Sequence, residues 1–216
     1  MQADHALTEP GKPLQAALIE RVTSSASLNA LRAGFTTVRN LRDRSGATLA
    51  LRDAIKNGWV LGPRIVAAGA AISVTAGHID ETLDLRDDFA MAVNEDNLCN
   101  GADSCREAVR KQLRRGVDVI KIATTGGVNS RFGAGIGQQM FADEAKAVVE
   151  TAHLAGKKVA VHAHGTDAIN VALAAGVDSI EHGTVPNEQS LKLFRDGGAY
   201  YVPTLSVING YLERLA

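Results

Sequence analysis

The sequence predicts an α/β fold in which short buried strands alternate with longer amphipathic helices around a parallel sheet. Six short runs are apolar and rich in β-branched residues, and the segments between them repeat apolar residues with the period of a helix. Several of the runs follow similar glycine-containing turns. With 45% hydrophobic and 22% charged residues among 216, the composition is that of a globular domain with its own core.

The strand-like runs occupy residues 36–41, 64–68, 118–123, 158–162, 178–181 and 200–203. Helices are expected over residues 14–33, 48–57, 104–115, 142–155, 166–175 and 187–196. Gly156 and Gly176 lie between a predicted helix and the next strand, where glycine ends a helix in the left-handed conformation. The repeated joint indicates a repeated strand–helix unit.

One stretch does not follow this alternation. Residues 69–103 have a mixed Gly, Thr and Asp composition without a convincing period, and long loops of this kind in a compact domain are usually functional or disordered. We expect residues 1–216 to form a single domain that contains this excursion.

The strand–helix units fit two architectures, a doubly wound open sheet and a (β/α)8 barrel. A doubly wound nucleotide-binding sheet carries a glycine-rich turn directly after its first strand, and no GxGxxG motif follows either of the first two runs. Histidine, lysine and threonine instead gather where the strands end, which is where barrel enzymes assemble their sites. The sequence therefore favours an incomplete (β/α)8 barrel.

Charge and hydropathy narrow the function classes. The 23 Lys and Arg residues against 24 Asp and Glu residues give a net charge of −1, which argues against a nucleic-acid partner. No apolar stretch approaches the roughly 18 residues of a membrane span, and the first residues do not form a signal peptide, so we expect a cytoplasmic protein. Cys99 and Cys105 flank a turn that would let them pair, but without an export signal we expect both to be reduced.

The strongest chemical signal comes from lysine and histidine at strand ends. Lys121 lies within the apolar run VIKIA, whose burial would lower the pKa of its ammonium group. His162 and His164 lie on one face of the next strand, because side chains alternate with period two, and His182 ends the strand after that. Three imidazoles that converge with Lys121 at one barrel mouth favour a metal site over purely structural histidines.

Three further features carry weaker signals. The turn TTGGV at residues 124–128 is equally typical of an anion-binding loop and of a tight turn. Residues 133–137 have the glycine spacing of a nucleotide fingerprint but not its strand-to-helix context, so we interpret them as a flexible lid. Arg131 would suit a substrate carboxylate, although a surface arginine is the more common explanation.

Several motifs resemble those of the amidohydrolase superfamily, and especially its imidazolonepropionase-like and Xaa-Pro dipeptidase-like branch. They are AGFTTVRN at residues 33–40, PRIVAAG at 63–69, TAGH at 75–78, VIKIATTGGV at 119–128, VHAHGT at 161–166 and SIEHGT at 179–184. The resemblance extends over nearly all of the chain from about Leu28. It implies a (β/α)8 TIM barrel that binds one or two divalent ions, usually zinc.

The resemblance also implies roles for individual residues. Lys121 would react with carbon dioxide to give a carbamate that bridges two metal ions, and His162 and His182 would be ligands of the second ion. His164 and His78 would contact the substrate. The family's His-x-His on the first strand and its aspartate on the last strand have no counterpart, so the six runs correspond to strands two to seven, and the catalytic acid/base remains unassigned.

The activity that the resemblance implies is hydrolysis of C–N bonds by a metal-activated hydroxide, in amides, peptides or cyclic amides of small molecules. The expected partners are a small-molecule substrate and, in an oligomer, further copies of the chain, with no nucleic acid and no membrane. The alternative is a catalytically incomplete barrel fragment that acts only by associating with the missing segments or with a partner. Sequence alone leaves both hypotheses open.

Overall fold

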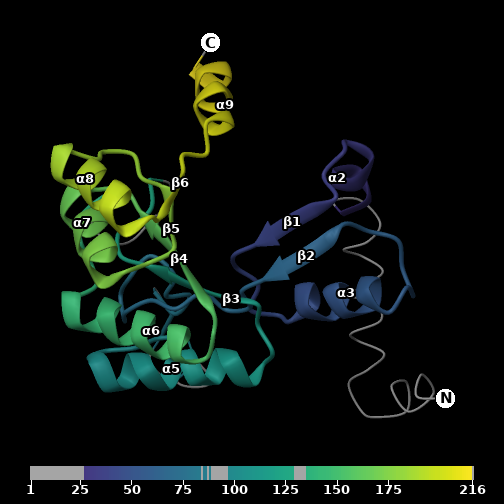
Figure 1. Cartoon of the computed structure of the whole chain (residues 1–216), viewed down its shortest axis with the longest axis horizontal. Coiled ribbons are helices and arrows are strands. Elements are labelled where there is room, and N and C mark those ends of the chain that lie inside the picture. The colour runs from purple at the N-terminus through teal and green to yellow at the C-terminus, as the bar shows by residue number, and fades with distance from the viewer. Residues whose placement is uncertain (1–26, 84, 87, 89–96, 129–134, 216) are drawn as a thin grey trace.

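The structure is a computed structural model, and it describes residues 27–215 except for 84, 87, 89–96 and 129–134. The described residues form parallel strands and helices that alternate along the chain, as predicted (Figure 1). The described helices all lack the length and the apolar character of a membrane span.

All six predicted strands are present, each within one or two residues of its expected limits, and all pair in parallel. A two-stranded sheet contains β1 (Thr37–Asn40) and β2 (Arg64–Ala67). A four-stranded sheet contains, in chain order, β3 (Val119–Ala123), β4 (Lys158–Ala163), β5 (Ser179–His182) and β6 (Tyr200–Val202). Asp118 joins the sheets: its N–H donates to the Ala67 carbonyl at 2.8 Å, and its carboxylate accepts the Ala67 N–H at 2.9 Å. This is the strand order of a barrel segment.

The helices also follow the predicted order. They are α2 (Leu28–Arg32), α3 (Ala47–Lys56), α5 (Ala102–Arg114), α6 (Ala142–Leu154), α7 (Thr166–Ala175), α8 (Glu188–Gly197) and α9 (Ser206–Leu215). Of the helix predicted over residues 14–33, the described part is α2. Helices α5 to α8 cover one side of the four-stranded sheet, whereas α9, the helix expected after the last strand, extends away from it (Figure 1).

The two faces of the strands pack against two different apolar clusters. Ile120, Val161 and Ile180 pack with helix residues in the main core. The alternate strand positions form a smaller interior cluster that contains Val119 and Ala160. Because strand side chains alternate, Lys121 and His162 face this interior together with the smaller cluster.

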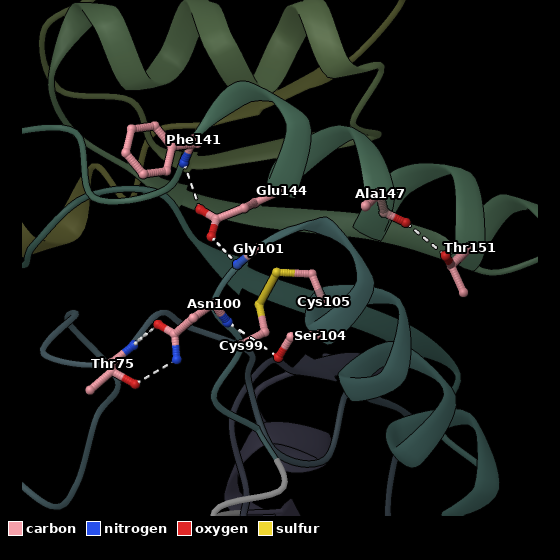
Figure 2. The surroundings of a disulfide bond; sticks show 10 residues. All are labelled: Thr75, Cys99, Asn100, Gly101, Ser104, Cys105, Phe141, Glu144, Ala147 and Thr151. Atoms are coloured by element: carbon pink, nitrogen blue, oxygen red, sulfur yellow. Dashed lines mark hydrogen bonds between the residues drawn. A yellow bond between two sulfur atoms is a disulfide. The ribbon is translucent and has the colours of Figure 1, made fainter.

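A disulfide between Cys99 and Cys105 corrects the expectation that both cysteines are reduced (Figure 2). The bond joins the end of the 69–103 excursion to the first turn of α5, and both residues are fully buried. The Cys99 N–H also donates to the Ser73 carbonyl at 2.9 Å. Disulfides persist in oxidising surroundings, so the two cysteines no longer indicate a reducing compartment.

Glu144 ties the same region to α6 (Figure 2). Its buried carboxylate accepts the Gly101 N–H at 2.6 Å and the Phe141 N–H at 2.8 Å, so it serves the first turns of α5 and α6 together. Helix amino ends leave backbone N–H groups without partners, and a carboxylate satisfies them well. The excursion is therefore fixed at its end to two helices that cover the sheet.

Candidate metal and substrate site

The carboxyl ends of β3, β4 and β5 position the predicted site residues. In the register of the sheet, His162 is the partner of Ala123 on β3 and of Glu181 on β5. Lys121 precedes Ala123 by two residues on the same face of β3 and is the partner of Ala160. Lys121, His162 and Glu181 are each less than 10% exposed. The strands thus place a lysine, an imidazole and a carboxylate inside the same end of the barrel segment.

Four histidines gather at this end. The rings of His162 and His78 are stacked with centroids 4.1 Å apart, and the His162 ring lies 4.6 Å from that of His164 and 4.8 Å from that of His182. The His164 and His182 rings are stacked at 5.1 Å. The structure therefore brings together all four histidines that the sequence analysis assigned to metal or substrate.

Hydrogen bonds orient three of these rings. His162 Nε2 lies 3.0 Å from the Gly126 carbonyl oxygen, which only accepts, so this ring carries its proton on Nε2 and keeps a lone pair on Nδ1. His164 Nδ1 lies 2.7 Å from Thr184 Oγ1, and His182 Nδ1 lies 2.8 Å from Thr204 Oγ1. Such partners fix the ring orientation of metal-binding histidines.

His182 and its partner Thr204 share a second feature. Both have positive backbone φ angles, 71° for His182 and 55° for Thr204, in the left-handed region that side chains with a Cβ rarely occupy. Strain of this kind costs about 1–3 kcal/mol per residue and tends to occur at functional sites. The end of β5 thus directs the His182 ring toward the barrel mouth at a local conformational cost.

Burial keeps the imidazoles neutral. It lowers the pKa of His162 to about 2 and that of His164 to about 4, and it lowers the pKa values of His78 and His182 as well. Nearby positive charge on Lys121 adds to the effect for all four rings. Neutral imidazole is the form that binds metal ions, so the cluster has the protonation state that a metal site needs.

Lys121 is buried among the same groups. Burial lowers its pKa to about 7, while the negative charge of Glu181 acts in the opposite direction. Glu181 is itself held from across the barrel interior: Arg39 Nη2 donates to both carboxylate oxygens at 2.8 Å, and Ser179 Oγ donates to one of them at 2.7 Å. At neutral pH a large fraction of Lys121 is therefore an uncharged amine, the form that reacts with carbon dioxide.

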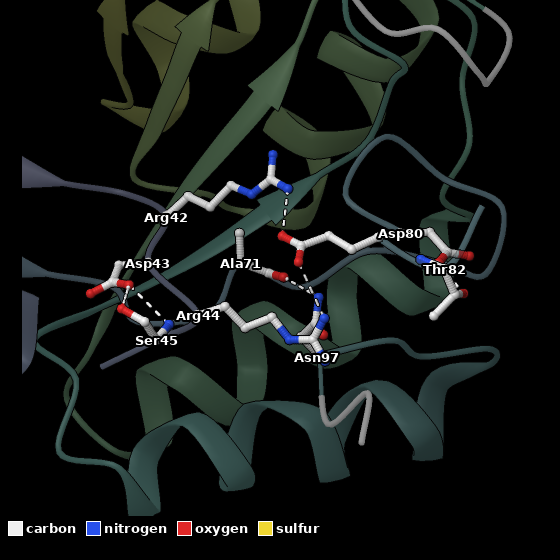
Figure 3. A network of polar contacts seen from close by, with 9 residues as sticks. Arg42, Asp43, Arg44, Ser45, Ala71, Asp80, Thr82 and Asn97 are labelled. Carbon is white, nitrogen blue, oxygen red and sulfur yellow. Dashed lines mark hydrogen bonds and ion pairs between the residues drawn. The ribbon is translucent and has the colours of Figure 1, made fainter. Parts of the chain in front are cut away.

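Polar contacts hold the loop that carries His78 (Figure 3). Asp80 accepts the Ala76 N–H at 2.7 Å and the Thr82 N–H at 2.9 Å. The Glu81 carboxylate accepts hydrogen bonds from Arg42 Nη2 at 2.7 Å and from Arg44 Nη1 at 3.3 Å. These bonds connect the loop to the one after β1. The His78 ring is thus kept against His162 by contacts from neighbouring strand ends.

Two cavities open onto the cluster. The larger, about 520 Å³, is lined by the four histidines and by apolar residues that include Val128, Tyr201 and Leu205. The smaller, about 250 Å³, reaches Lys121 and Glu181. The larger cavity has the size and the mixed lining of a small-molecule site.

The described residues supply only part of a metal centre. Among them, no three His, Cys, Asp or Glu side chains are placed so as to hold an ion by themselves. His162 and His182, with Lys121 beside them, nevertheless have the donor types of the half-site that the resemblance implies. Arg131, the candidate for a substrate carboxylate, lies outside the described residues.

The residues that support this site were not predicted from the sequence. Thr184, Thr204 and Arg39 were not singled out, and the turn that contains Gly126 was not connected with His162, because each of these residues contacts its partner across a long sequence separation. The available signals were the turn TTGGV at residues 124–128 and the glycine and threonine that follow the histidine in SIEHGT.

Comparison with known proteins agrees with this fold. The amidohydrolase family model matches residues 7–212, so the chain belongs to the amidohydrolase family. It is 35% identical over 202 residues to the ochratoxinase of Aspergillus niger, an alignment that covers 85% of this chain and 40% of that protein.

Solved structures give the same result. A Xaa-Pro dipeptidase crystallised with methionine in its active site is 41% identical, with a TM-score of 0.78, over 90% of this chain and 46% of the other. The structure of A. niger ochratoxinase is 32% identical, with a TM-score of 0.79, over 96% of this chain and 48% of the other. The chain thus spans less than half the length of these relatives, which agrees with an incomplete TIM barrel.

Proposed function

We propose that this chain carries the β3–β5 half of a metal-dependent hydrolase site for amide or peptide bonds in small molecules. The observation that carries the proposal is the convergence of His162, His182 and Lys121 on one barrel end, with neutral imidazoles and a lysine pKa of about 7. Membership of the amidohydrolase family supports the class of reaction.

In this proposal Lys121, as its carbamate, and the His162 and His182 rings would hold the divalent ion, which we take to be zinc. A bound divalent cation would polarise the scissile carbonyl and lower the pKa of water. Hydrogen bonds to the Gly126 carbonyl and Thr204 Oγ1 would keep the two rings in place. The residue that transfers a proton to the leaving amine is not assigned to any side chain described here.

His78 and His164 would line the substrate side of the same centre. His164 is oriented by Thr184, and both rings face the 520 Å³ cavity. Its apolar lining would suit an N-acyl amino acid, a dipeptide or a cyclic amide, whose polar bond would lie near the histidines.

The first test measures zinc by elemental analysis in the chain expressed with zinc and bicarbonate, and in its Lys121→Ala and His162→Gln variants. The proposal predicts zinc in near-stoichiometric amounts, and its loss in both variants. His153→Gln is the matched control, because that histidine lies on α6 and pairs with Asp178 at 2.8 Å, outside the cluster. Zinc that is absent from the folded chain, or equal in all variants, would contradict the proposal.

A second candidate function is association with the segments that complete the barrel. Among the described residues, β1 and β6 each pair with one strand only, and Leu205 beside β6 is 71% exposed. Unpaired strand edges and exposed apolar side chains favour further pairing. Hydrolysis of an amide panel by the zinc-loaded chain alone would argue against this candidate, whereas activity that needs an added partner segment would support it.

A further inference from the structure

Residues 133 and 134 of the segment interpreted from the sequence as a lid lie outside the described residues. Its described part belongs to a short segment, residues 135–138, here termed the strap, that crosses the ends of β3 and β4. Gln138 forms an antiparallel bridge with Thr125, and the Gln139 N–H donates to the Thr124 carbonyl at 2.8 Å. The strap therefore adds backbone contacts to the turn that leaves the lysine strand.

Two glycines lie directly beneath the strap. A Cβ atom built on Gly126 would lie 2.2 Å from the carbonyl oxygen of Gly135, and one built on Gly165 would lie 2.3 Å from that of Ile136. Both distances are far below van der Waals contact, and both involve backbone atoms that cannot move aside like a flexible side chain. Any residue larger than glycine at either position would push the strap away.

Backbone conformation does not explain these glycines. Gly165 has an extended conformation with φ of −79°, and Gly126 is absent from the residues with positive φ. Other residues would adopt the Gly165 conformation without strain, and Gly126 does not need the left-handed region that favours glycine. The need for glycine at both positions is therefore a need for close approach of the strap.

The turn beneath the strap also determines the geometry of His162. The Gly126 carbonyl accepts hydrogen bonds from Thr125 Oγ1 at 2.8 Å and from His162 Nε2 at 3.0 Å. Thr125 Oγ1 in turn accepts the His164 N–H at 3.2 Å. A shift of the strap would thus reach the ring of His162 through one residue.

We infer that the strap, seated on Gly126 and Gly165, is a positioning device that holds the Gly126 carbonyl against His162 and so fixes the proton of that ring on Nε2. The inference bears on the proposed function, since His162 is a proposed ligand, but it concerns the metal-free ring and is testable without activity. Gly126 and Gly165 are positioning residues, since neither side-chain position contacts the larger cavity.

The test uses long-range ¹H–¹⁵N NMR of histidine-labelled, chelator-treated chain at pH 8, with His162→Gln to assign the signals. The unchanged chain should show His162 as a single Nε2–H tautomer. Gly126→Ala should remove that signal or convert it to a mixture of tautomers, and Gly165→Ala should do so to a smaller extent. Gly197→Ala is the matched control, because that glycine has ordinary φ and open space around its Cβ position.

A Nδ1–H tautomer in the unchanged chain, or an unaltered signal in a folded Gly126→Ala variant, would overturn the inference. Unfolding of both variants, measured by circular dichroism, would also overturn it, because the glycines would then be general determinants of folding. Zinc titration adds a separate readout, with affinity expected to fall about 10- to 100-fold in Gly126→Ala. If the unchanged chain binds no zinc, the proposed function fails while the NMR result still decides the inference.

Discussion

The two sheets of this chain differ in how they use their strands. Strands β3 to β5 are buried along almost their whole length and lead to the histidine cluster, whereas β1 alternates between exposed and half-buried residues and contributes one arginine, Arg39. The two-stranded sheet has only a small apolar core around Leu51 and Ile65. The comparison suggests that β3 to β5 define the chemistry and that β1 supplies charge that supports it from the opposite side.

The largest expected effect comes from the buried lysine. Lys121→Met should abolish zinc binding, a larger loss than the roughly 100-fold weakening expected when a hydrogen-bond partner of a ligand is removed. The free energy of unfolding should stay equal or rise, because an apolar side chain replaces a buried amine. Elemental analysis and urea unfolding measure the two quantities. A variant that keeps its zinc would show that β3 does not supply a ligand.

Thr204→Val should weaken zinc binding about 10- to 100-fold, because it removes the partner of His182 Nδ1. Thr184→Val is the comparison, since Thr184 orients His164 instead, and it should leave the zinc affinity almost unchanged. Equal effects of the two variants on zinc would remove the distinction between the metal side and the substrate side.

Loss of the contact between the two sheets should reduce stability. Arg39→Ala leaves the buried Glu181 carboxylate without its cation and should lower the free energy of unfolding by about 2 kcal/mol, a figure that allows for the partial exposure of Arg39. Arg39→Lys should recover part of this loss. If urea unfolding of Arg39→Ala matches that of the unchanged chain, β1 does not support β5 in the way proposed here.

The disulfide should contribute to the free energy of unfolding about as much as the Arg39–Glu181 pair, or less. Reduction, or the double change Cys99→Ser and Cys105→Ser, should cost about 2 kcal/mol, because the closed loop is short and the chain-entropy benefit grows with loop length. Thermal unfolding with and without reductant measures this effect. The double variant should be insensitive to reductant, and a reductant effect of equal size in that variant would refute the assignment.

The strand order was predictable because apolar runs, helical periods and glycine turns are local features of the sequence. All six strands and the convergence of His162, His164 and His182 were predicted on this basis, and the family membership was predicted from the motifs around them. Local pattern predicts which residues occupy strand ends, and barrel geometry then brings those ends together.

The supporting contacts were not predictable in the same way. The bond from His162 to Gly126 spans 36 residues and that from Arg39 to Glu181 spans 142, and both depend on the relative placement of separate strands. The pairing of Cys99 with Cys105 was wrongly rejected, because the absence of an export signal was given more weight than the turn between them. Partners across such distances become visible only once the sheet register is known.

The most direct test of the central claim is the zinc X-ray absorption spectrum of the chain loaded with zinc and bicarbonate. The account predicts two imidazole ligands together with oxygen ligands, and loss of bound zinc in Lys121→Ala. A folded chain that binds no zinc, or a spectrum without two imidazoles that is unchanged in Lys121→Ala, would contradict the claim that the ends of β3 to β5 form a metal half-site.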